Sequence, residues 1–189
     1  MDQLYLCRHG ETEWTLAGKH TGKTDISLTK RGKEEAKLLQ KRIAKVPFSA
    51  AFTSPKKRAL ETAEGIRPKA IIEAKISEWD YGDYEGLTTA EIHQVRPNWN
   101  LFQDGAPNGE TATEVGKRAD AFIHQIKGYQ GNVAVFSHGH FLRVLAARFL
   151  GLDPKMGKLF FLSVASLCIL GYDRGTPVLM LWNETDYSS

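Results

Sequence analysis

The chain has 189 residues, of which 42% are hydrophobic and 25% charged, proportions typical of a folded protein with a hydrophobic core. Its formal net charge is +3, from 25 basic and 22 acidic side chains, and so close a balance argues against nucleic acid as the main partner. No linker-like stretch divides the sequence, so we expect a single domain over residues 1–189.

The N-terminal sequence MDQLYLC has no basic segment and no long apolar stretch, so we expect no signal peptide and no membrane partner. The two isolated cysteines, Cys7 and Cys168, provide neither a disulfide framework nor a zinc site. Together these features predict a cytoplasmic protein.

Six short apolar runs have the length and composition of β-strands. They are residues 4–7, 50–53, 70–73, 133–136, 166–170 and 178–182. Amphipathic segments with helical spacing lie between most of them. This alternation predicts an α/β fold in three layers, α/β/α, around a mostly parallel central sheet of about six strands.

Capping residues mark where the helices begin and end. Thr29 is expected to cap one helix, and Ser54-Pro55 to provide the cap and first residue of a second. Thr111 and Glu114 form a predicted capping box, and a further helix should stop at Gly151. The segment 97–110, rich in Gly, Pro, Asn and Asp, is predicted to be an excursion over the surface.

Two segments place His-Gly directly after an apolar strand: Cys7-Arg8-His9-Gly10 and Ser137-His138-Gly139-His140. The carboxyl ends of parallel strands are where open α/β sheets bind ligands. Glycine after each histidine would let the backbone turn sharply and approach a ligand closely. We therefore expect both histidines at one edge of the sheet.

Two further side chains are expected at the same edge. Arg58 follows a strand and would lean back toward it from a helix, although a run such as Lys56-Lys57-Arg58 is ordinarily a solvated face. Glu78 opens the segment 78–86, in which aromatic residues alternate with acids and glycines. On spacing alone, any of the other acids of this segment can also be the catalytic acid; they are Asp80, Asp83 and Glu85.

These residues match what the cleavage of a phosphate monoester requires. Two arginines can hold the phosphate oxygens, a neutral imidazole can attack phosphorus, and a second histidine can donate to another oxygen. A carboxylic acid can protonate the leaving alkoxide and then activate water. The candidates are Arg8, Arg58, His9, His138 and Glu78. No cofactor is needed, and no third metal ligand accompanies the His138-x-His140 pair at a convincing spacing.

Four motifs, in order from residue 4 to residue 151, together resemble the histidine phosphatase (phosphoglycerate mutase-like) superfamily. They are Arg8-His9-Gly10-Glu11-Thr12, Ser54-Pro55-x-x-Arg58-Ala59-x-Glu61-Thr62, the segment 78–86 and Ser137-His138-Gly139. The resemblance implies a phosphoglycerate mutase-like fold, with His9 as the phosphorylated nucleophile. It also implies a phosphate pocket formed by Arg8, Arg58 and His138, with Glu78 as the proton donor.

The resemblance extends to the substrate. It implies that Thr21, Gly22 and Tyr81 border the substrate, with Gly139 beside them. Thr15 stands where many members carry asparagine, and its hydroxyl could still donate to phosphate. For His140 we favour a supporting position or the rim of the pocket over direct substrate contact.

Within the family, the motifs are similar to the branch that contains sedoheptulose-1,7-bisphosphatase and bacterial acid phosphatases. This predicts a small phosphorylated metabolite as the partner, a sugar phosphate or bisphosphate, with Lys19, His20 or Lys23 near its distal end. The short interval from Glu78 to His138 favours hydrolysis over mutase chemistry, which needs a lid that excludes water. The alternatives are a mutase, a protein phosphohistidine phosphatase, a silent phosphate-binding module and a metallo-hydrolase.

Overall fold

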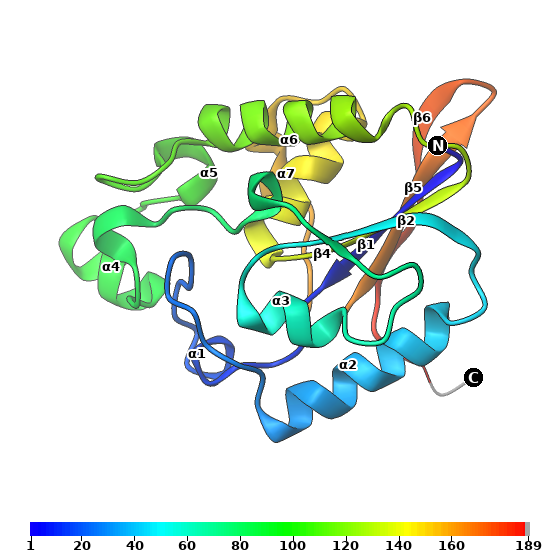
Figure 1. The fold of residues 1–189 in the computed structure, drawn as a ribbon. Helices are drawn as coiled ribbons and strands as arrows, with labels where there is room; N and C mark the ends of the chain where they lie inside the picture. Colours follow the sequence, from blue (N-terminus) through cyan, green and yellow to red (C-terminus); the bar gives the residue numbers. More distant parts are fainter. Residues whose placement is uncertain (188–189) are drawn as a thin grey trace.

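The computed structural model describes residues 1–187, in which six strands form one sheet (Figure 1). The strands are β1 (Gln3–Arg8), β2 (Phe48–Thr53), β3 (Ile71–Ile72), β4 (Asn132–Ser137), β5 (Leu167–Asp173) and β6 (Thr176–Glu184). Their order is β3-β2-β4-β1-β5-β6. All six predicted strands are confirmed, although β3 is only two residues long.

The sheet is mixed but mostly parallel, as predicted. β1 and β2 both run parallel to β4, and β3 runs parallel to β2, whereas β5 and β6 are antiparallel to their neighbours. Arg8 and Ser137 are partners in the register of β1 and β4. The residues that follow these strands, His9 and His138, therefore leave the sheet side by side.

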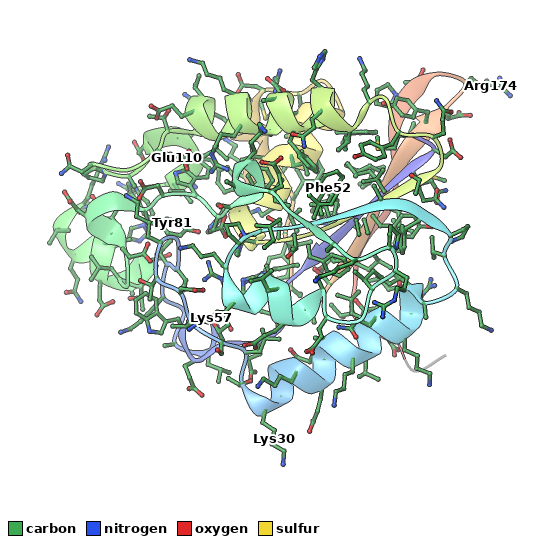
Figure 2. The ribbon with its side chains drawn as sticks, viewed as in Figure 1. Lys30, Phe52, Lys57, Tyr81, Glu110 and Arg174 are labelled. Carbon is green, nitrogen blue, oxygen red and sulfur yellow. The ribbon has the colours of Figure 1, made fainter. Side chains whose placement is uncertain are left out.

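Helices cover both faces of the sheet (Figure 1), which confirms the three layers. α2 (Lys30–Ile43) and α3 (Lys57–Thr62) lie on one face, and α6 (Ala112–Ile126) and α7 (Gly139–Phe149) on the other. Because side chains alternate along a strand, Leu4 and Leu6 join the core on the α6 and α7 face, whereas Tyr5 and Cys7 join the core beneath α2. Phe52, labelled in Figure 2, packs edge-on against Phe122 of α6.

Shorter elements connect these layers. They are α1 (Glu13–Leu16), α4 (Thr89–Val95), α5 (Leu101–Asp104) and the 3-10 segments η1 (Ala74–Ile76), η2 (Gly82–Tyr84) and η3 (Pro154–Leu159). Over residues 1–187, none of the helices combines the length and the apolar character needed to cross a membrane.

Most of the predicted helix boundaries are confirmed. The hydroxyl of Thr29 caps α2, Thr111 and Glu114 form the capping box of α6, and Gly151 follows α7 with a φ of 76°. The predicted start of α3 is wrong, because the helix begins at Lys57. Ser54 does not cap α3; its hydroxyl is instead a partner of His138.

The segment 97–110 is not the surface excursion that its composition predicts. Trp99, Leu101 and Phe102 are buried and belong to the main core cluster. Phe102 packs edge-on against Trp79, with ring centroids 5.5 Å apart. Three apolar side chains spaced over four residues thus anchor a segment that is otherwise rich in turn formers.

The end of β1 packs tightly against the first turn of α2. A Cβ at Gly32 would lie 2.1 Å from the carbonyl oxygen of Glu11, and one at Gly10 would lie 2.4 Å from the carbonyl oxygen of Gly32. Gly10 is therefore needed for close backbone approach to α2, rather than for the sharp turn at a ligand that the sequence suggests.

This contact leads to a prediction for stability. Gly32→Ala should lower the free energy of unfolding by about 3 kcal/mol, because the added methyl group meets backbone that has no room to move. Urea denaturation measures the change. Gly128→Ala is the matched control, since a Cβ there would meet nothing within 4 Å. Equal stabilities for the two variants would contradict the packing described here.

Candidate active site

A cavity of about 240 Å³ opens where β1 and β4 end. Eight of the side chains or glycines expected at the site line it: Arg8, His9, Thr15, Thr21, Glu78, Tyr81, Gly139 and His140. The other three do not line it, but each contacts a residue that does: Arg58, His138 and Gly22. The sheet edge thus brings the expected residues together.

His9 presents a free ring nitrogen to the cavity. Its Nδ1 lies 2.8 Å from the carbonyl oxygen of Gly10, which can only accept, so Nδ1 carries the hydrogen. Burial, reinforced by Arg58 and Arg8, lowers the pKa of His9 well below its ordinary value and keeps the ring neutral. Nε2 therefore keeps its lone pair, and within residues 1–187 it has no hydrogen-bond partner.

Arg58 is fully buried, unlike the lysines beside it in sequence. Its guanidinium donates to the carbonyl oxygens of Thr21 and Thr24, each at 2.9 Å, and its Nε donates to Nδ1 of His138 at 3.1 Å. Arg58 thereby joins the cavity wall around Thr21 to the second histidine.

His138 sits between Arg58 and Ser54. Because its Nδ1 accepts from Arg58, its Nε2 carries the hydrogen and donates to the Ser54 hydroxyl at 2.8 Å. Burial lowers the pKa of His138 well below its ordinary value. Both ring nitrogens are thus engaged in this state, and donation to a phosphate oxygen requires His138 to exchange one of these partners.

Arg8 has an unused donor at the cavity. Its guanidinium donates to the carbonyl of Leu162, while its Nε is buried and has no partner in the described chain. A Cβ at Gly139 would lie 3.2 Å from the guanidinium carbon, so glycine there gives Arg8 its space. A buried N–H without an acceptor is costly, and a phosphate oxygen would relieve that cost.

Glu78 is fixed at the start of α7. Its Oε1 accepts from the backbone N–H groups of Trp79 at 2.9 Å and Phe141 at 2.8 Å, and its Oε2 accepts from that of His140 at 3.1 Å. The N-terminus of a helix favours a carboxylate in this position. The carboxyl group is therefore held beside both histidine motifs.

The three alternative acids of this segment have other partners. Asp80 forms an ion pair with Lys23 at 2.7 Å, and Asp83 accepts from the Asn108 side chain at 2.9 Å. Glu85 accepts from the backbone N–H groups of residues 22 and 24. Of the four acids, Glu78 is the one that lines the cavity.

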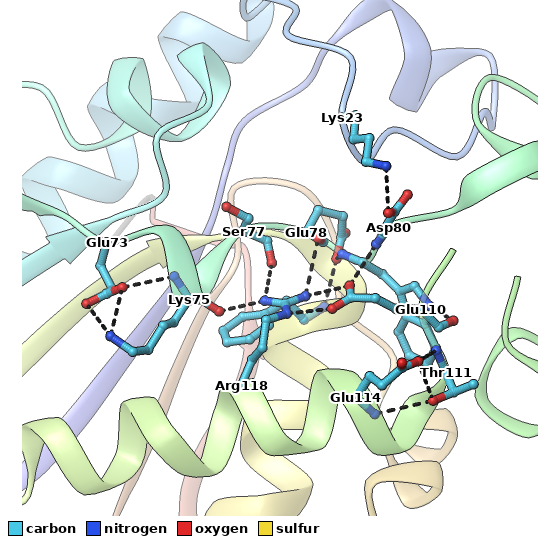
Figure 3. A network of polar contacts seen from close by, with 12 residues as sticks. Lys23, Glu73, Lys75, Ser77, Glu78, Asp80, Glu110, Thr111, Glu114 and Arg118 are labelled. Carbon is cyan, nitrogen blue, oxygen red and sulfur yellow. Dashed lines mark hydrogen bonds and ion pairs between the residues drawn. The ribbon is translucent and has the colours of Figure 1, made fainter. Parts of the chain in front are cut away.

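An ion pair from α6 anchors the Glu78 segment (Figure 3). Arg118 meets both carboxylate oxygens of Glu110, at 2.7 and 2.8 Å, and also donates to the carbonyl oxygens of Lys75 and Ser77. Glu110 in turn accepts from the backbone N–H of Asp80 at 2.9 Å. The backbone on both sides of Glu78 is thereby tied to the helix layer.

The residues predicted to contact the substrate also make close contacts within the protein. The hydroxyl of Thr15 lines the cavity but donates to the carbonyl of Thr12, at 2.9 Å, and that of Thr21 donates to the carbonyl of Lys19. Gly22 does not line the cavity, and a Cβ there would be 2.5 Å from the carbonyl oxygen of Trp79.

At the distal end, Lys19 and His20 line the cavity as expected, but Lys23 does not, because it is exposed and paired with Asp80. Sequence reasoning missed Arg143, which also lines the cavity and whose pKa burial lowers to about 10. The sequence feature that could have indicated Arg143 is its position three residues after His140 on a predicted helix, because this spacing places both side chains on one face.

A family model described as "Histidine phosphatase superfamily (branch 1)" matches residues 4–185. The chain belongs to this superfamily. It is 34% identical to the acid phosphatase of Mycobacterium tuberculosis, over 98% of this chain and 94% of that protein. It is 33% identical to the sedoheptulose 1,7-bisphosphatase of Saccharomyces cerevisiae, over 79% of this chain and 68% of that protein.

Solved structures agree with the assignment to the histidine phosphatases. The product of the open reading frame Rv3214 from Mycobacterium tuberculosis superposes with a TM-score of 0.93 at 34% identity, covering 97% of this chain and 98% of that chain. A phosphoserine phosphatase from Entamoeba histolytica gives a TM-score of 0.88 at 30% identity over the full length of both chains. This histidine phosphatase is thus a hydrolase of phosphate monoesters.

Within residues 1–187, no three His, Cys, Asp or Glu side chains are grouped so that they could hold a metal ion. The two histidines of the second motif face different partners: His138 contacts Arg58 and Ser54, and His140 contacts Tyr81. They do not converge on a shared point, as a metal pair would.

Three buried histidines and the half-buried His140 should make this histidine phosphatase sensitive to acid. Burial lowers the pKa of each in the folded state: His9, His20, His138 and His140. The unfolded chain therefore binds more protons below pH 6.5, and the free energy of unfolding should fall there by up to about 1.4 kcal/mol per pH unit for each histidine.

Urea denaturation between pH 7.5 and pH 5.5 measures this slope. The variant His140→Phe should show a shallower slope, by about one proton, because it removes one of the four groups. A stability that stays constant or rises toward pH 5.5 would mean that these histidines are protonated in the folded protein.

Proposed function

We propose that this histidine phosphatase hydrolyses phosphate monoesters of sugars or related small metabolites, without a metal ion, through a phosphohistidine at His9. The observation that carries the proposal is the neutral His9 ring, whose Nδ1–H is held by Gly10 while Nε2 is open to the cavity. Similarity to an acid phosphatase and to a sedoheptulose 1,7-bisphosphatase supports the hydrolysis of phosphate monoesters.

In the first step, Nε2 of His9 attacks phosphorus, the N–P bond forms and the bond from phosphorus to the ester oxygen breaks. Arg8 supplies its unpaired Nε–H to a phosphate oxygen, and Arg58 and His138 exchange existing partners to bind the others. Glu78, in its protonated form, gives its proton to the leaving alkoxide.

In the second step, Glu78, now a carboxylate, takes a proton from water, and the water oxygen attacks phosphorus. The N–P bond breaks, inorganic phosphate leaves and His9 returns to its neutral form with the lone pair on Nε2. The carboxyl group begins the next cycle protonated, so the same residue serves as acid and then as base.

The cavity supports a small substrate. Its volume of about 240 Å³ suits a metabolite better than the phosphorylated surface of a folded protein. Lys19 and Arg143 line the same cavity and could neutralise the second phosphate of a bisphosphate. We also propose a cytoplasmic location, in keeping with the free thiols of Cys7 and Cys168.

The test is phosphate release from sugar mono- and bisphosphates, phosphoglycerates, phosphoserine and nucleotides, with excess chelator present. Release that survives chelator, with the highest kcat/KM among sugar phosphates, is the expected result. Loss of release in chelator with recovery on adding zinc would contradict the metal-free mechanism. Transfer of phosphate between two positions of a phosphoglycerate, without release, would instead favour the mutase alternative.

A further inference from the structure

Two histidine rings form one wall of the cavity beyond the nucleophile. His20 and His140 lie nearly parallel, with ring centroids 6.0 Å apart. Both also line an adjoining hollow of about 180 Å³, to which His9 does not contribute. A substrate whose phosphate sits at His9 and whose chain extends toward this hollow must pass the two rings.

Tyr81 fixes the hydrogen of His140. Its Oη lies 2.6 Å from Nδ1 of His140, and in the described chain the buried Tyr81 has no other hydrogen-bond acceptor. Burial raises the pKa of Tyr81 well above its ordinary value and lowers the pKa of His140 well below its own, so the proton stays on the phenol. Nδ1 therefore accepts, and Nε2 of His140 carries an N–H.

His20 has the opposite arrangement. Its Nδ1 lies 2.8 Å from the carbonyl oxygen of Leu87, and a carbonyl can only accept. Nδ1 therefore carries the hydrogen. Burial lowers the pKa of His20, so the ring is neutral and Nε2 keeps a lone pair. Within residues 1–187, neither His20 Nε2 nor His140 Nε2 has a protein partner, and neither belongs to the buried unpaired atoms.

We propose that this pair recognises the hydroxyl groups of a sugar or polyol chain, with His140 Nε2–H donating to a hydroxyl oxygen and His20 Nε2 accepting a hydroxyl hydrogen. An alcohol offers both functions, so it satisfies both rings. A carboxylate alone has no hydrogen to give to His20, and an ammonium alone has no lone pair for His140, so an amino acid would have to place its carboxylate at His140 and its ammonium at His20. The inference rests on the proposed function and narrows its substrate class to polyhydroxylated phosphate esters.

The test compares esters that differ in their hydroxyl groups. The ratio of kcat/KM for ribose 5-phosphate to that for pentyl phosphate measures recognition of hydroxyls, because both esters carry five carbons. We expect this ratio to fall about tenfold in both His140→Phe and His20→Phe, as the loss of one hydrogen bond predicts. His124→Phe, an exposed position on α6, is the matched control and should keep the wild-type ratio.

Tyr81→Phe tests the assignment of the hydrogen. It leaves the His140 ring in place but removes the donor that holds Nδ1, so the hydrogen can move from Nε2 to Nδ1. The ratio of kcat/KM for ribose 5-phosphate to that for pentyl phosphate should fall several-fold. The imidazole ¹⁵N signals of His140 should move from values typical of the Nε2–H tautomer toward those of the Nδ1–H tautomer. Comparing ribose 5-phosphate with 2-deoxyribose 5-phosphate in the unmodified enzyme needs no variant, and we expect the deoxy ester to be poorer.

The proposal would be overturned if the ratio of kcat/KM for ribose 5-phosphate to that for pentyl phosphate stayed at its wild-type value in both histidine variants, and if the deoxy ester were as good a substrate as ribose 5-phosphate. A wild-type preference for phosphoserine that His140→Phe abolishes would also overturn it. The binding of ribose 5-phosphate by the His9→Ala protein, measured by calorimetry with and without His140→Phe, separates this inference from the proposed function. Tighter binding of ribose 5-phosphate than of pentyl phosphate, lost with His140→Phe, would support the hydroxyl wall even if His9 proved not to be the nucleophile.

Discussion

His9→Ala should lower phosphate release by at least about 1,000-fold and abolish a covalent phosphoenzyme. Nε2 of the imidazole faces the cavity with its lone pair free and has no partner among residues 1–187, and alanine provides no substitute. The remaining arginines can still bind phosphate, so the variant should retain affinity for the substrate while losing turnover.

Quenching the wild-type enzyme during turnover of a ³²P-labelled ester should trap label on the protein. A phosphohistidine is labile in acid and stable in alkali, which distinguishes it from a phosphoserine or phosphothreonine. His124→Ala, an exposed position on α6, should keep both activity and label. Label that persists in His9→Ala would assign the nucleophile to another residue.

The sheet and the edge that carries the candidate site were predictable because they depend on local patterns. Short apolar runs predicted all six strands, and the capping residues Thr29 and Thr111 predicted the starts of α2 and α6. His9 and His138 follow β1 and β4, which are neighbours in the sheet, and this adjacency brought the two motifs together.

The features that the sequence did not predict depend on contacts between residues far apart in the chain. Ser54 looked like a helix cap, but its hydroxyl meets His138, 84 positions later. Trp99 and Phe102 lie among turn-forming residues, so no periodicity predicted their burial. The glycines after both histidines serve close packing against Gly32 and Arg8, which no local pattern could indicate.

The choice among the four acids shows the same limit at the site. Spacing left Asp80, Asp83 and Glu85 open as alternatives to Glu78, and their partners in the structure distinguish them. Three are bound outside the cavity, by Lys23, by Asn108 and by the backbone of residues 22 and 24. Glu78 alone of these four lines the cavity, which makes its replacement the second decisive experiment.

Glu78→Gln should affect two kinds of ester differently. With an alkyl ester such as ribose 5-phosphate, the leaving alkoxide needs a proton, and phosphorylation of His9 should slow by about 100- to 10,000-fold. With p-nitrophenyl phosphate, the leaving phenolate is stable without a proton, so His9 should still be phosphorylated readily. Hydrolysis of the phosphoenzyme still needs a base, so labelled protein should accumulate with the aryl ester and not with the alkyl ester.

Rapid-quench trapping of ³²P-labelled enzyme measures both steps. Asp83→Asn, in which an exposed acid of the same segment is changed, is the matched control and should behave as wild type. A glutamine oxygen in the place of Oε1 keeps the bonds from the Trp79 and Phe141 N–H groups, so the bond from the His140 N–H is lost, at a cost of about 1–3 kcal/mol in stability. If both esters phosphorylate His9 equally slowly and no phosphoenzyme accumulates, Glu78 orients the start of α7 and the proton comes from another group.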